Sequence, residues 1–146
     1  MRLELERRVE ELGIVERVRF VGFTDNPWSL MAGADALLLA SRWEGLPNVA
    51  LEALACGTPV IATSESGGIE ELVRASPNGA VQSVAFGEPF LDAVNRTPAK
   101  REPLPVSLLP DVYDASAVAQ RFASILVDAL GESDTTGVGG FGQTDE

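Results

Sequence analysis

Two acidic side chains flank the expected start of a short helix near the middle of this 146-residue chain. Glu44 stands in a loop before the helix, and Glu52 is the only charged residue between Asn48 and Gly57. Side chains of a helix lean toward its N-terminus. The Glu52 carboxylate is therefore expected about one turn below the helix start, on the side of Asn48.

The chemistry predicted by this arrangement is nucleotide binding. The first amides of a helix lack internal acceptors and carry the positive end of the helix dipole, so a phosphate or diphosphate can bind there. Gly45 and Pro47 keep the preceding loop compact and leave its amides accessible. A carboxylate one turn further along can accept hydrogen bonds from vicinal ribose hydroxyls, as acidic residues do in dinucleotide folds. Glu44 is expected to face the group on the far phosphate.

The residues around this helix predict an open α/β sheet, which binds ligands at the carboxyl ends of its strands. Asn48 is expected to cap the helix and Gly57 to end it. Alternation of strands and helices implies right-handed crossovers and a Rossmann-like parallel sheet flanked by helices. The strands are expected over residues 35–40 and 60–63, and the helices over 49–56 and 69–74, after a turn at Gly67-Gly68.

The flanking residues give a weaker pattern. Only three strands are well defined, those starting near Arg17, Asp35 and Val60, which is few for such a domain. Residues 77–110 are expected to be mainly loop, and residues 131–146 a disordered tail. The other expected elements are a helix over 3–12, a strand over 17–21, a helix over 27–33 capped by Asn26 that buries Trp28, Leu30 and Met31, a short strand near 80–86, a helical turn near 90–94 and a helix over 115–130.

Composition excludes several classes of function. The chain has no histidine and a single cysteine, Cys56, which excludes an internal disulfide, a Cys/His zinc site and a histidine-dependent catalytic pair. A net charge of −11 argues against nucleic acid or an anionic membrane surface as the main partner. No apolar run reaches the roughly 20 residues that span a bilayer, so a soluble, cytoplasmic protein without a transmembrane segment is expected.

The segment Glu44–Glu52, EGLPNVALE, is followed by ALACGTPVIAT and by Gly67-Gly68. Together these residues closely resemble the Glu-x7-Glu region of retaining glycosyltransferases with the GT-B fold, the large family 4 group. The resemblance extends back through RVRFVGF at 17–23 and covers roughly residues 1–75. It implies the donor-binding C-terminal domain of a two-domain enzyme, whose N-terminal domain binds most of the acceptor.

The resemblance also implies roles for the matching residues. Glu44, the implied catalytic residue, contacts hydroxyls of the donor sugar, and Glu52 binds the ribose. The implied reaction moves a hexose from a nucleoside-diphosphate sugar to a hydroxyl of a sugar, lipid or other acceptor, with retention and without a metal or other cofactor. Backbone amides near Leu46–Val49 hold the diphosphate. The implied donor-binding set is Glu44, Gly45, Leu46, Pro47, Asn48, Val49 and Glu52.

The chain departs from the family in what it contains. The first strand and helix of the family's C-terminal domain, with basic residues that neutralise the diphosphate, have no counterpart, and Arg42 and Arg74 lie elsewhere. We therefore interpret residues 1–130 as a partial GT-B C-terminal domain: a truncated reading frame, a fragment, or a domain that needs a partner such as the missing N-terminal domain. The chain alone is expected to transfer no sugar, and membrane attachment of the full-length enzyme is left open.

Two functions stay open on these grounds. One is the donor half of a retaining glycosyltransferase, and the other is a non-catalytic nucleotide-binding or interaction module. A sugar-nucleotide epimerase of the same fold has no support, because its histidine-bearing features have no counterpart. Among single residues, Cys56 is assigned to a helix end and Trp28 to the core, while Trp43 is undecided between stacking on a base or sugar and a structural place. The sequence specifies neither the base, the sugar nor the acceptor.

Overall fold

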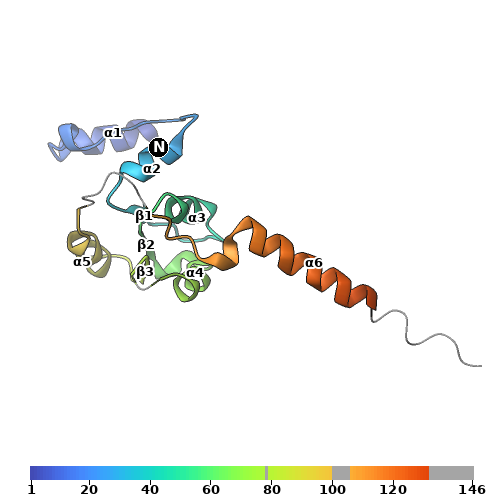
Figure 1. Cartoon of the computed structure of the whole chain (residues 1–146). Coiled ribbons are helices and arrows are strands. Elements are labelled where there is room, and N and C mark those ends of the chain that lie inside the picture. Colours follow the sequence, from blue (N-terminus) through green and yellow to red (C-terminus); the bar gives the residue numbers. More distant parts are fainter. Residues whose placement is uncertain (78, 100–105, 132–146) are drawn as a thin grey trace, which may run out of the picture.

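The computed structural model describes residues 1–77, 79–99 and 106–131. Within these residues a three-stranded parallel sheet runs in the order β1-β2-β3, which confirms the predicted α/β class. Helices flank both faces of the sheet (Figure 1). The strands are β1 (Leu37–Leu39), β2 (Val60–Thr63) and β3 (Val81–Val84), and the helices that flank them are α3 (Asn48–Ala55), α4 (Ile69–Ala75) and α5 (Glu88–Arg96).

The two faces of the sheet are covered unequally. On one face α3 and α4 bury Leu54, Ile69 and Leu72 completely against β2 and its neighbours. On the other face α5 packs Phe90 over Ile61 of β2. This helix does not reach across β1, where Leu38 is 48% exposed, and in the described part of the chain β1 pairs only with β2. The sheet therefore has one uncovered corner, at the outer edge of β1.

Helix α3 begins and ends through backbone geometry. It starts at Asn48 after an N-cap at Pro47, whose carbonyl accepts a hydrogen bond from the Ala50 amide at 2.9 Å. The prediction that Asn48 caps the helix is wrong, because Asn48 already has helical geometry and its side chain makes no cap bond. Gly57 ends the helix as predicted: its φ is +69°, and its amide donates to the Leu54 carbonyl.

Two helices precede the sheet, α1 (Arg2–Glu11) and α2 (Pro27–Gly33), both as predicted. The Asn26 side chain caps α2 by accepting a hydrogen bond from the Ser29 amide at 3.1 Å. The strand predicted over 17–21 is wrong: the described backbone there forms no ladder, because no neighbouring strand lies beside it. Burial of Trp28 and Leu30 is wrong as well, since both side chains are half exposed and α2 presents mainly Met31 to the core.

The later part of the chain is more regular than the sequence predicts. The short strand near 80–86 is confirmed by β3, and the predicted helical turn near 90–94 is part of the longer α5. After a short 3-10 segment, Asp111–Tyr113, comes α6 (Ala115–Gly131), which confirms the predicted final helix and adds Gly131 to it. The remainder of the predicted tail, residues 132–146, lies outside the described residues.

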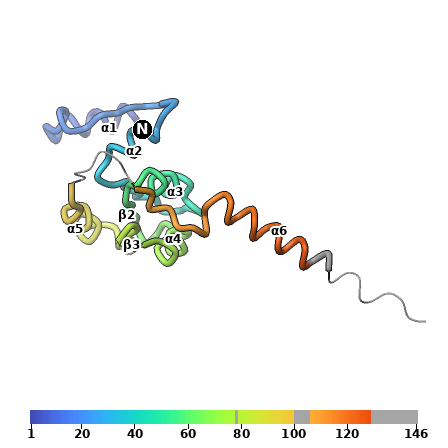
Figure 2. The backbone as a smooth tube through the Cα atoms, viewed as in Figure 1, coloured from blue at the N-terminus to red at the C-terminus, as the bar shows by residue number. Residues whose placement is uncertain are grey.

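Helix α6 extends away from the sheet (Figure 2), so its apolar stripe is not buried in the described structure. Phe122 in the middle of that stripe is 63% exposed. The segment before the helix is better anchored, because the Leu108 amide donates to the Leu54 carbonyl at 2.8 Å. No helix among the described residues is both long and apolar enough to cross a membrane.

Candidate functional site

The predicted site lies where the loops after β1 and β2 meet, and hydrogen bonds hold these loops together. The Ser41 carbonyl, at the end of β1, accepts hydrogen bonds from the Thr63 hydroxyl at 2.7 Å and the Ser66 hydroxyl at 2.8 Å. The side chains of Thr63 and Ser66 are buried and lie within hydrogen-bond distance of each other. The beginning of the loop that carries Glu44 is therefore fixed to the loop after β2.

The same two loops touch again at Gly67 and Gly68. The Gly68 amide donates to the Glu44 carbonyl at 3.4 Å, and a Cβ on Gly68 would overlap the Gly45 carbonyl oxygen. A Cβ on Gly67 would lie 2.7 Å from the Glu44 carbonyl oxygen, and the φ of +61° at Gly67 already favours glycine. The predicted turn at these glycines is confirmed. The part of the chain that lies close against these two glycines is the backbone of the Glu44 loop.

The start of α3 is open to an anion. No described residue accepts a hydrogen bond from the backbone amides of Asn48 and Val49, and the first turn of α3 carries no acidic side chain. Pro47, which precedes them, is buried and has no amide hydrogen to offer. The amides at this helix start have the arrangement that binds phosphate in other proteins.

The two predicted carboxylates are both half-buried, Glu44 in the loop and Glu52 one turn inside α3. In the described part of the chain neither side chain forms an ion pair or a side-chain hydrogen bond. The loop between them supplies Gly45 and Leu46, both exposed at the surface. The chain thus brings the predicted donor-binding residues into one loop and one helix, and their roles toward a donor stay predictions.

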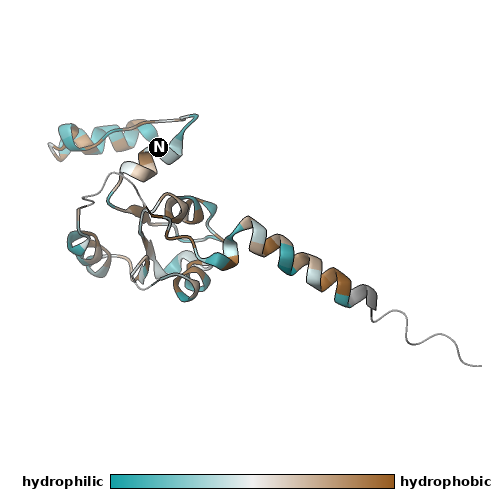
Figure 3. Cartoon of the chain, in the orientation of Figure 1, coloured by the Kyte–Doolittle hydropathy of each residue, from teal (hydrophilic) through white to brown (hydrophobic). Residues whose placement is uncertain are grey.

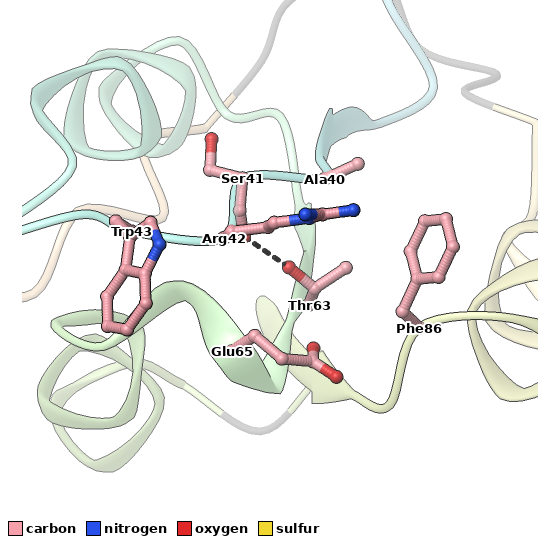
Figure 4. A pocket seen from close by; sticks show the side chains of 7 residues that line it. All are labelled: Ala40, Ser41, Arg42, Trp43, Thr63, Glu65 and Phe86. Atoms are coloured by element: carbon pink, nitrogen blue, oxygen red, sulfur yellow. Dashed lines mark hydrogen bonds between the residues drawn. The ribbon is translucent and has the colours of Figure 1, made fainter.

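A pocket of about 720 Å³ opens beside this loop, at the carboxyl ends of all three strands (Figure 4). Sequence reasoning left Trp43 undecided and missed Glu65 and Phe86. The available signal was position, because each residue follows a strand within a few residues, where α/β sheets bind ligands. The lining comes from Ser41, Arg42 and Trp43 after β1, from Thr63 and Glu65 at and after the end of β2, and from Phe86 after β3.

Comparison with known proteins identifies the family. Residues 1–96 match the family model described as glycosyl transferases group 1. The chain belongs to this family. It is 35% identical over 92 residues to the lipopolysaccharide core biosynthesis glycosyltransferase LpsE of Rhizobium meliloti, a stretch that covers 63% of this chain and 27% of that protein.

Two further relatives show the same partial coverage. An uncharacterized glycosyltransferase of Methanocaldococcus jannaschii is 34% identical over 122 residues, which is 78% of this chain and 30% of that protein. The lipopolysaccharide 1,6-galactosyltransferase of Salmonella typhimurium is 32% identical over 90 residues, 59% of this chain and 25% of that protein. The match therefore spans between 25% and 30% of the length of these three relatives. The resemblance to glycosyltransferases is confirmed, while the GT-B family 4 assignment and retention stay predictions.

Proposed function

We propose that this chain binds the nucleoside diphosphate of a sugar donor and forms the donor-binding part of a retaining glycosyltransferase of the GT-B type. The observation that carries the proposal is the start of α3. The amides of Asn48 and Val49 have no acceptor among the described residues, no acidic side chain shares their turn, and Glu52 lies one turn further along the same helix. A diphosphate at the amides and a ribose at Glu52 fit this order of groups.

The proposed reaction breaks the bond between the anomeric carbon and the diphosphate oxygen. Negative charge grows on the leaving diphosphate as this bond breaks, and fixed amides at a helix start stabilise such charge without reorganising. Glu44 contacts hydroxyls of the hexose. The hydroxyl of a sugar, lipid or other acceptor attacks the anomeric carbon on the face that the diphosphate leaves, so the configuration is retained. The proton of that hydroxyl passes to the departing diphosphate, which balances the step. Because the amides of Asn48 and Val49 supply the electrostatic stabilisation, we expect no metal requirement.

The proposal includes a second polypeptide segment that carries the acceptor. The outer edge of β1 has no partner strand among the described residues, and Leu38 beside it is half exposed. These features support a sheet that is extended or covered in the working enzyme, which we place in the cytoplasm. We therefore expect this chain alone to bind nucleotide but transfer no sugar. The open edge of β1 also fits the alternative, a nucleotide-binding module without catalysis. Hexose transfer by a longer form of the protein would exclude that alternative.

Nucleotide titration tests the proposal. The whole chain is titrated with UDP and GDP by calorimetry and saturation-transfer NMR, next to Glu52→Ala and the control Glu10→Ala on the exposed face of α1. We expect Glu52→Ala to weaken binding by about 1–3 kcal/mol, because a charged hydrogen bond to ribose is lost. The control should bind as the original chain does. Equal affinity of all three would remove Glu52 from the site, and no binding of either nucleotide would contradict the proposal.

A further inference from the structure

Helix α6 presents an apolar stripe that no part of the described chain buries. Val118, Phe122 and Ile125 follow one another at spacings of four and three residues, and Leu126 lies four residues after Phe122, so all four share one face of the helix. These side chains are between 49% and 63% exposed. Because α6 extends away from the sheet (Figure 1), a second molecule can reach this face.

Helix α6 has a well-formed start but little packing to hold it. The Asp114 carboxylate accepts hydrogen bonds from the amides of Ser116 at 2.9 Å and Ala117 at 3.3 Å, which caps the first turn. A 17-residue helix without packing is nevertheless only marginally stable in water. A surface that covers the stripe therefore stabilises the helix and also buries apolar area.

The charges of α6 disfavour a membrane as that surface. Arg121 and Asp128 are the only charged residues of the sequence Ala115–Gly131, and their charges cancel. A helix that lies on an anionic membrane carries several Lys or Arg residues on its polar face. The stripe of α6 therefore fits the apolar face of another protein helix better than it fits lipid.

The stripe follows the seven-residue pattern of paired helices. Val118 and Ile125 occupy the d position of this pattern and Phe122 the a position between them, while Arg121 and Asp128 both occupy g, beside the stripe. In the described part of the chain neither Arg121 nor Asp128 forms an ion pair. When two identical helices pair in antiparallel orientation, the g positions of one lie along the g positions of the other.

These two charges select one orientation and one register. With Phe122 opposite Ile125 of a second copy, Arg121 lies nearest to Asp128 of that copy, and the twofold symmetry repeats the ion pair. A shift of one heptad toward the N-terminus brings the two Arg121 side chains together, and a shift the other way brings the two Asp128 side chains together. Parallel pairing places Arg121 beside Leu126 and forms no such ion pair.

The same register overlaps the two helices along almost their whole length. When Phe122 lies opposite Ile125, Gly131 of one copy is level with Ser116 of the other. Each helix therefore ends beside the start of its neighbour and does not run into the neighbour's sheet.

We propose that α6 is a self-association surface on which a second copy of this chain packs its own α6 in antiparallel orientation. Val118, Phe122 and Ile125 form the buried seam, and Arg121 of each copy pairs with Asp128 of the other. The contact is short, with 17 residues from each copy, so the dimer is weak, with a dissociation constant on the order of 100 µM. At the much lower concentrations used for circular dichroism the chain is a monomer and the stripe stays exposed.

Sedimentation equilibrium of the whole chain, up to millimolar concentration, tests the seam. We expect a monomer at low concentration and a dimer at high concentration. Phe122→Ala or Ile125→Ala should weaken the dimer more than about tenfold, because each removes an apolar group from both sides of the contact. Val127→Ala is the matched control, since Val127 is 69% exposed and lies off the stripe, and it should leave the dimer unchanged.

Charge reversal tests the orientation and the register. Arg121→Glu or Asp128→Arg alone puts like charges together at two symmetric places and should weaken the dimer about threefold to tenfold. The double variant Arg121→Glu/Asp128→Arg should recover the affinity of the original chain. Circular dichroism checks that each variant keeps its helices. Single reversals without effect, or a double variant that does not recover, would overturn the antiparallel pairing.

Two other occupants of the stripe are outcomes of the same experiments. A chain that stays monomeric at every concentration, or a dimer that Phe122→Ala does not weaken, would overturn the proposal. Flotation with phosphatidylglycerol vesicles checks for a membrane. Vesicle binding that Phe122→Ala abolishes and Val127→Ala does not would assign the stripe to lipid and overturn the proposal. We expect no flotation of the original chain.

Discussion

The helices at the centre of the molecule and its last helix carry similar apolar stripes, but the central stripes are buried and the stripe of the last helix is exposed. In the centre, Leu54 of α3 and Leu72 of α4 are completely buried against the sheet. In α6, Phe122 and Ile125 lie on a comparable stripe and are more than half exposed. Figure 3 colours stretches of the α6 ribbon brown, the colour of hydrophobic residues. Amphipathic periodicity thus predicts a helix in both regions, but burial depends on whether a second surface lies against it.

The largest difference is expected when a side chain is shortened on each stripe. Leu54→Ala should lower the free energy of unfolding by about 2–5 kcal/mol, because it leaves a cavity under α3. Phe122→Ala should change it by less than about 1 kcal/mol, since most of that ring is already in solvent. Urea denaturation followed by circular dichroism measures both. Equal losses would show that α6 is covered in solution and would remove the contrast.

A smaller effect is expected where the two loops touch. Gly68→Ala should destabilise the fold by about 1–3 kcal/mol, because its Cβ has to displace the Gly45 carbonyl. The matched control is Gly33→Ala at the end of α2, where a Cβ meets nothing within 4 Å and helix propensity favours alanine. Thermal denaturation of both variants decides. If Gly68→Ala has the same melting temperature as Gly33→Ala, the Glu44 loop is not packed on Gly67 and Gly68.

The smallest effect concerns the connection to α6. Tyr113 donates to a Glu71 carboxylate oxygen at 3.3 Å, and burial, followed by the nearby charge and hydrogen bond of Glu71, raises the pKa of its phenol above the ordinary 10.0. Because the folded chain holds this proton more tightly than the unfolded chain, the contribution to stability is present below pH 10.0 and is lost as the pH rises through the folded pKa.

Tyr113 is the only tyrosine, so its ionisation can be followed directly by absorbance. We expect Glu71→Gln to bring the pKa part of the way back toward 10.0, since the effect of burial stays. Glu70→Gln on the same helix turn is the control and should leave the titration unchanged. A phenol that titrates identically in the original chain and in Glu71→Gln would show that the contact between Tyr113 and α4 does not persist in solution.

The predictable part of the fold is the part fixed by neighbours in the sequence. Asn26 caps α2 and Gly57 ends α3 because each contact spans only a few residues. The segment at 17–21 has the alternation of a strand, but a strand also needs a hydrogen-bonded neighbour, and none lies beside it in the described structure. Local pattern predicts the extended backbone at Val18 and cannot predict the pairing.

The site also has a part that depends on neighbours in the sequence and a part that depends on distant segments. Glu44, Glu52 and the helix start lie within one short stretch, so spacing alone could place them relative to one another. The pocket that joins Trp43 to Phe86 depends on three loops brought together by the register of the sheet. No local pattern records that register, which explains why Phe86 was missed. Exposure of Trp43 likewise depends on what the fold leaves uncovered.

The backbone contact at Gly67 and Gly68 restricts how this protein can respond to a substrate. Three hydrogen bonds tie the Glu44 loop to the end of β2 and to the loop after it, so neither loop is free to fold over a bound molecule as a lid. Any closure has to carry the sheet and both loops as one rigid body, with its hinge elsewhere in the chain or in a partner. The rate of opening and closing would then be set by that hinge and not by the residues that hold the substrate.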